Sequence, residues 1–148
     1  MERNISACRK EIRMHHYRLT PQREAVLSVL LEEKNTHFTP YELFRKAKRT
    51  HPELGLATVY RALRLFMKLG LVREVQFNQG PTYYEFRDSR RKQHYHLVCK
   101  KCGHVEEING FLSQHFIESV VKKTGFSITD YSCQFYGYCE KCKTEVNY

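Results

Sequence analysis

Two pairs of cysteines with the same short spacing constrain the fold of this 148-residue chain more than any other feature. Cys99 and Cys102 form one C-x-x-C pair, and Cys139 and Cys142 form the other. A structural zinc ion takes four thiolates in a tetrahedron, and a C-x-x-C turn can supply two of them. We therefore expect a closed zinc site that helps to fold a small C-terminal module. The 36 residues between the pairs exceed the spacing of a simple zinc ribbon, so a redox pair or four reduced, buried cysteines remain as alternatives.

Composition and charge narrow the class of protein. The chain is 41% hydrophobic and 28% charged, which is enough to build a core. No apolar run approaches the roughly 18–20 residues of a membrane span, and the polar first ten residues do not resemble a signal peptide. We therefore expect a cytoplasmic protein with no membrane partner, in which the cysteines stay reduced. The net charge of +9 favours a polyanionic partner such as nucleic acid or an anionic membrane surface.

Charge and cysteine content change near residue 88. Residues 1–88 hold 16 lysines and arginines against 10 acidic residues, while residues 89–148 hold 9 against 6. Five of the six cysteines lie in the second part, and the polar segment 87–92 between the parts is typical of a hinge. The sequence therefore predicts two domains, 1–88 and 89–148.

Residues 1–88 show the pattern of helices followed by a hairpin. Thr20-Pro21 and Thr39-Pro40 are helix starts, with threonine as N-cap and proline at the first helical position. A third helix is expected from about Ala57 to Leu69, where Gly70 ends it. Two β-rich runs, 71–77 and 82–86, flank a turn. Helices closed by a hairpin predict a winged helix-turn-helix, whose last helix would enter a DNA major groove.

Residues 89–148 predict a small module that mixes strands with one helix. Strands are expected at 96–99, 105–108, 126–129 and 134–138, and a helix is expected at 112–123, which Gly125 would end. The fold class is therefore α+β, with an N-terminal winged helix-turn-helix domain and a small C-terminal α/β domain.

A second set of candidate metal ligands lies outside the cysteines. His94 and His96 lie two apart on an expected strand and so point to one side. Glu85, Glu107 and His37 could complete a site for iron, manganese, zinc or cobalt. A His-x-His pair is also common on protein surfaces, and only the fold can bring His37 near the others.

Four segments resemble the ferric uptake regulator (Fur) family in its order and spacing. They are Tyr-Arg-Leu-Thr-Pro-Gln-Arg at 17–23, Gly-Leu-Ala-Thr-Val-Tyr-Arg-Ala-Leu at 55–63, His-Tyr-His-Leu-Val-Cys-Lys-Lys-Cys-Gly at 94–103, and Tyr-Gly-Tyr-Cys-Glu-Lys-Cys at 136–142. Members of that family are dimeric, metal-dependent transcription regulators with an N-terminal winged helix and a C-terminal dimerisation module. The resemblance implies a homodimer that binds an A·T-rich, palindromic double-stranded DNA operator.

The resemblance also assigns roles to residues. It implies that Cys99, Cys102, Cys139 and Cys142 share one structural Zn²⁺. It implies a regulatory site between the domains, for Fe²⁺ or Mn²⁺ with Zn²⁺ as a substitute in vitro, formed by His37, Glu85, His94, His96 and Glu107. Bases and phosphates would be contacted by Arg18, Thr58, Tyr60, Arg61 and Arg64.

These features predict an iron-responsive transcriptional repressor and not an enzyme. Two alternatives lie within the family: zinc sensors tend to use a cysteine ligand, and peroxide sensors typically carry aspartate where this chain has Glu85 and Glu107. Outside the family, two histidines and a carboxylate could form a non-haem iron enzyme, although this short chain has no recognisable oxygenase scaffold. An RNA-binding zinc module is a further alternative.

Overall fold

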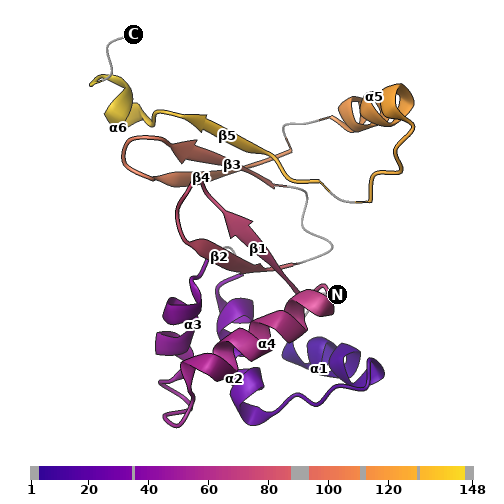
Figure 1. Ribbon diagram of the computed structural model, residues 1–148, viewed down its shortest axis with the longest axis vertical. Coiled ribbons are helices and arrows are strands. Elements are labelled where there is room, and N and C mark those ends of the chain that lie inside the picture. Colours follow the sequence, from indigo (N-terminus) through magenta and orange to yellow (C-terminus); the bar gives the residue numbers. More distant parts are fainter. Residues whose placement is uncertain (1–3, 35, 88–93, 111–112, 130, 146–148) are drawn as a thin grey trace. The chain divides into compact units, whose positions relative to one another are not determined.

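The computed structural model describes residues 4–34, 36–87, 94–110, 113–129 and 131–145, with the side chain of His94 excepted. The chain divides into two compact units, Met1–Ser89 and Arg90–Tyr148. Figure 1 follows the elements of each unit in chain order. Apart from Arg87, the segment expected to be a hinge lies outside the described residues.

Four helices and a hairpin make up the first unit: α1 (Ile5–Met14), α2 (Pro21–Glu32), α3 (Pro40–Ala47), α4 (Leu56–Lys68), β1 (Val72–Gln76) and β2 (Thr82–Phe86). Thr20 and Thr39 are N-caps, and each is followed by proline at the first helical position. Thr39 and Glu42 form a capping box, in which each side chain accepts a hydrogen bond from the other residue's backbone N–H. The predicted starts of α2 and α3 are therefore confirmed, and α4 begins one residue before its predicted start.

The sequence interpretation did not include α1. Asn4 caps this helix by accepting a hydrogen bond from the backbone N–H of Ala7 at 2.9 Å. The helix buries Cys8 and Ile12, which lie one turn apart on one face. Its other residues are mainly polar, so the apolar stripe is narrow and the sequence pattern does not clearly indicate a helix.

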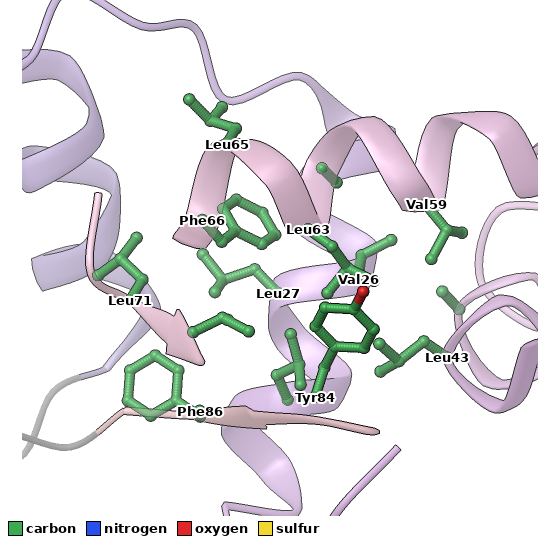
Figure 2. Close-up of a cluster of buried hydrophobic side chains, with 14 of the residues drawn as sticks. Val26, Leu27, Leu43, Val59, Leu63, Leu65, Phe66, Leu71, Tyr84 and Phe86 are labelled. Atoms are coloured by element: carbon green, nitrogen blue, oxygen red, sulfur yellow. The ribbon is translucent and has the colours of Figure 1, made fainter. Parts of the chain in front are cut away.

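An apolar core joins the helices of the first unit to its hairpin. Figure 2 shows the side chains of α2, α3 and α4 converging on aromatic residues of β2. Helix α4 buries Leu65 as well as Val59 and Leu63, whereas Leu69, just after the helix, is only partly buried. The labelled members of this cluster are Val26, Leu27, Leu43, Val59, Leu63, Leu65, Phe66, Leu71, Tyr84 and Phe86.

The second unit is a three-stranded sheet with two helices. Its elements are β3 (His94–Cys99), β4 (Val105–Asn109), α5 (Gln114–Thr124), β5 (Gln134–Gly137) and α6 (Glu140–Lys143). The strand order is β4-β3-β5, with β4 antiparallel and β5 parallel to β3. Gly125 ends α5 in the left-handed conformation, at φ 71°.

One expected strand of the second unit is wrong, and one helix was not foreseen. Residues 126–129 form no strand, and Phe126 is 72% exposed. The central strand β3 pairs with β4 and β5, and this run pairs with neither of these two outer strands. The short helix α6 begins directly after the first cysteine of the second C-x-x-C motif and includes the second, Cys142. None of the helices in the described residues is both long and apolar enough to cross a membrane.

Candidate metal centres and nucleic-acid face

The two C-x-x-C motifs meet because β3 and β5 are parallel neighbours. Cys99 is the last residue of β3 and is paired with Gly137, the last residue of β5. The backbone N–H of Lys100 donates to the Gly137 carbonyl at 2.8 Å, which holds the two strand ends together. Each motif then turns back immediately: Gly103, at φ 74°, follows Cys102, and Cys139 is the N-cap of α6. A parallel pairing therefore brings together pairs that are 36 residues apart in the sequence.

The four cysteine sulfurs form a compact cluster. All four lie within 4.8 Å of one another, and the Cys102 and Cys139 sulfurs are 3.7 Å apart. A regular tetrahedron with Zn–S distances of about 2.3 Å has S···S edges of about 3.8 Å. The sulfurs of Cys99, Cys102, Cys139 and Cys142 thus fit a four-thiolate zinc site. This arrangement is typical of structural zinc, because all four ligands are protein sulfurs.

The local backbone already favours a thiolate at one of these positions. Hydrogen bonds from backbone N–H groups, first that of Cys102 and then that of Cys139, lower the pKa of Cys99 to about 6. The Cys139 N–H lies 3.4 Å from the Cys99 sulfur. Burial raises the pKa of Cys142 to about 12. A cation is therefore needed before both sulfurs can be thiolates at neutral pH.

In the first unit, His37 and Glu85 are brought into contact by a bridge between neighbouring backbones. Phe38 and Tyr84 exchange two backbone hydrogen bonds of 2.9 and 2.7 Å, which tie the segment before α3 to β2. The adjacent residues then face each other, and His37 Nε2 lies 2.8 Å from Glu85 Oε2. The ring of Phe77 packs edge-on against the imidazole of His37, with centroids 5.2 Å apart. An imidazole and a carboxylate held in this way are suited to bind a divalent metal.

Arg73 also contacts this pair, and sequence reasoning did not single it out. It lies directly opposite Glu85 in the β1–β2 register, and its Nε donates a hydrogen bond to Glu85 Oε1. The Glu85 carboxylate is buried, with 1% of its side chain exposed. Only a prediction of the hairpin register, set by the length of its turn, could have revealed this partner.

In the second unit, His96 and Glu107 are cross-strand partners on β3 and β4. His96 Nε2 lies 3.8 Å from Glu107 Oε1, and His96 is 3% exposed. This separation leaves the two side chains near each other on one face of the sheet, as shared metal ligation requires. His94 begins β3, two residues from His96, but its side chain lies outside the described residues.

The candidate DNA-contacting residues of α4 point away from the core. Tyr60 is 45% exposed, and Arg61 and Arg64 are also exposed, while Val59 and Leu63 are buried. The guanidinium of Arg61 donates to the Thr58 hydroxyl at 3.2 Å, one turn earlier. No side chain caps the first turn of this helix. The helix thus presents a phenol and two guanidinium groups to solvent, which are side chains of the kind that can contact bases and phosphates.

Arg18, the remaining candidate, lies in the segment between α1 and α2. Its carbonyl accepts a hydrogen bond from Arg23 at 2.9 Å, and its side chain is exposed. The same segment lines an open hollow whose other walls include Arg9, Arg13 and His16. This surface is therefore basic.

Comparison with known proteins shows similarity to the ferric uptake regulator family. The sequence pattern of the ferric uptake regulator family matches residues 14–136. A ferric uptake regulation protein of Bacillus subtilis is 38% identical over 143 residues, which is 96% of each chain. A peroxide-responsive repressor of Staphylococcus epidermidis is 29% identical, over 99% of this chain and 93% of its own.

Solved structures agree with the sequence comparison. The ferric uptake regulator of Vibrio cholerae superposes with a TM-score of 0.72 at 30% identity, over 89% of this chain and 99% of the other. That structure was described for a rearrangement of its DNA-binding domains. The family pattern covers most of the chain. This chain therefore belongs to the ferric uptake regulator family of metal-responsive transcription regulators.

Proposed function

We propose that this protein is an Fe²⁺-responsive, DNA-binding transcriptional repressor that acts in the cytoplasm, with Mn²⁺ able to replace Fe²⁺. The observation that carries the proposal is one histidine–carboxylate pair in each unit. His37 and Glu85 are in contact in the first unit, and His96 and Glu107 are cross-strand partners in the second. Such donors suit Fe²⁺ and Mn²⁺, whereas a thiolate ligand would favour zinc.

The two pairs, together with His94, are proposed to bind one regulatory ion. That ion would supply a cross-link between residues 1–88, the proposed DNA-binding domain, and residues 89–148, the proposed dimerisation domain. The chain's own part is to hold the ligands ready: the Phe38–Tyr84 bridge fixes His37 beside Glu85, and the β3–β4 ladder fixes His96 beside Glu107. Metal would then favour the arrangement of the domains that binds DNA, because it binds that arrangement better.

Structural zinc is assigned to Cys99, Cys102, Cys139 and Cys142. Among its described residues, the second unit buries few apolar side chains, and α5 buries none. A zinc ion would therefore contribute a large share of the stability of this unit. Its exposed aromatic residues, among them Phe116, Phe126 and Phe135, support a homodimer that would cover them.

DNA recognition is assigned to α4 and to the segment before α2. Tyr60 and Arg61 would contact base edges in the major groove, and Thr58 and Arg64 would contact the backbone. Arg18 would enter an A·T-rich minor groove, whose negative potential attracts a guanidinium. Two copies related by a twofold axis would read a palindromic operator.

The test is metal-dependent DNA binding, with a matched pair of carboxylate variants. A duplex is first selected from a random palindromic pool by the Mn²⁺-loaded protein, and its affinity is then measured by fluorescence anisotropy. Glu107→Gln should abolish the activation by Mn²⁺. Glu106→Gln, on the neighbouring exposed residue of β4, should retain it. Equal activation in the wild type and in Glu107→Gln would contradict the proposed site.

Peroxide sensing is the second candidate function, and the similarity to a peroxide-responsive repressor favours it. Peroxide sensors of the family typically carry aspartate where this chain has Glu85 and Glu107. A glutamate is one methylene longer than an aspartate, so it can reach the ion differently and change which coordination positions stay open to peroxide. We therefore favour iron response over peroxide sensing. Protein loaded with Fe²⁺ and exposed to micromolar peroxide should gain oxygen on His37 or His94 only slowly by mass spectrometry. Rapid oxidation with loss of DNA binding would identify a peroxide sensor.

A further inference from the structure

The carboxylate of Glu85 lies between a candidate metal ligand and a permanent cation. One oxygen, Oε2, is 2.8 Å from His37 Nε2. The other, Oε1, accepts a hydrogen bond from Nε of Arg73 on the facing strand. Arginine stays protonated at every physiological pH, so Arg73 brings a fixed positive charge to a carboxylate that is 1% exposed.

Two opposite effects of Arg73 on metal binding can be compared. A hydrogen bond to a ligating carboxylate orients it and so favours metal binding. A guanidinium a few ångströms from a divalent cation repels it and competes with it for the same carboxylate. Glu85 is already positioned by the β1–β2 ladder and by His37, so the orienting contribution of Arg73 is largely redundant. The repulsive effect has no such substitute and is therefore the larger one.

The charge of Glu85 in the metal-free protein also indicates that Arg73 weakens metal binding. A buried carboxylate is costly without a counter-charge, and Arg73 supplies that charge when no metal is bound. Metal binding then places two cations on one carboxylate. Removing Arg73 would make the metal-free form less favourable and relieve the repulsion in the metal-bound form.

We propose that Arg73 competes with the regulatory cation for Glu85 and raises the metal concentration at which the protein responds. This inference rests on the proposed function, because it takes Glu85 as a metal ligand. It adds a residue that sets the threshold of the response without binding the metal itself. The paired strands β1 and β2 are what bring the competing charge to the ligand.

The experiment measures Mn²⁺ affinity directly, by electron paramagnetic resonance of free Mn²⁺, on the full-length, zinc-containing protein. Arg73→Gln should bind Mn²⁺ about tenfold more tightly than the wild type, the order expected when the Coulomb repulsion between a divalent ion and a unit charge a few ångströms away is removed in a high-dielectric site. Arg73→Lys keeps the charge and should stay near the wild-type affinity. The matched control is Arg9→Gln, which removes one positive charge and a 2.5 Å ion pair with Glu24 elsewhere in the same unit. It should leave Mn²⁺ affinity unchanged.

An unchanged or weaker Mn²⁺ affinity in Arg73→Gln would overturn the proposal. If that variant does not fold, Arg73→Met decides in its place, because methionine keeps an apolar stem and lacks the charge. Glu85→Gln separates the two claims. If Glu85→Gln fails to weaken Mn²⁺ binding, the proposed metal site itself is wrong. If it weakens binding while the neutral variants at position 73 do not strengthen it, only the role of Arg73 is wrong.

Discussion

At the scale of single residues, the sequence predicts the candidate metal ligands but not all of the contacts between them. Each C-x-x-C motif was recognisable, because both ligands lie within one turn of chain. That the motifs share a cluster could not be derived from spacing, since it depends on the parallel pairing of Cys99 with Gly137. Arg73 was missed for a related reason: its contact with Glu85 depends on a hairpin register that no local pattern fixes.

Replacing Cys139 by serine tests the structural zinc by exchanging one proposed sulfur ligand for oxygen. Cys139 is the N-cap of α6, and serine is a good N-cap, so the helix start is preserved while a thiolate is lost. We expect Cys139→Ser to lose one zinc per chain and to unfold the second unit, measured by elemental analysis and by the thermal unfolding transition.

The control for this variant is Cys133→Ser, at a partly buried cysteine outside the four-sulfur cluster. It should keep its zinc and a folded second unit. A Cys139→Ser protein with unchanged zinc content and stability would show that the four sulfurs do not hold a structural ion.

Among the elements, those with a strong local start signal were predicted and those that depend on distant partners were not. Thr20-Pro21 and Thr39-Pro40 begin helices because the hydroxyl and the proline suffice at the N-terminus. The narrow apolar stripe of α1 gave no comparable signal. Residues 126–129 have the composition of a strand, but a strand exists only where its backbone pairs with a neighbour, and this run joins neither outer strand of the sheet, β4 or β5.

We predict that helix α4 recognises DNA sequence through Arg61 and contacts the DNA backbone through Arg64. Arg61→Ala should cost about 1–3 kcal/mol in binding free energy on the selected duplex, because a guanidinium makes two hydrogen bonds to guanine. The cost on random duplex should be smaller. Arg64→Ala, one turn along the same exposed face, should weaken both duplexes equally, as a phosphate contact does. Anisotropy titrations on both duplexes check this. An equal loss on both duplexes for Arg61→Ala would assign Arg61 to the backbone instead.

At the scale of the whole molecule, the two units are stabilised differently. The first has a large apolar core that spans its helices and hairpin. In the second, the buried side chains among the described residues are few and include two of the cysteines, Cys99 and Cys142. The two-part organisation could be predicted from charge and cysteine content. One metal ion shared by both parts is a proposal, which rests on the family resemblance and on the His–Glu pair found in each unit.

The most direct test of that shared ion is the number of Mn²⁺ ions bound per zinc-containing chain. The variants Glu85→Gln and Glu107→Gln remove one ligand from each unit. A shared site predicts one Mn²⁺ per wild-type chain, a similar loss of affinity in each single variant, and little further loss in the double variant. Two Mn²⁺ ions in the wild type, with each variant losing a different one, would contradict the account by showing two separate sites.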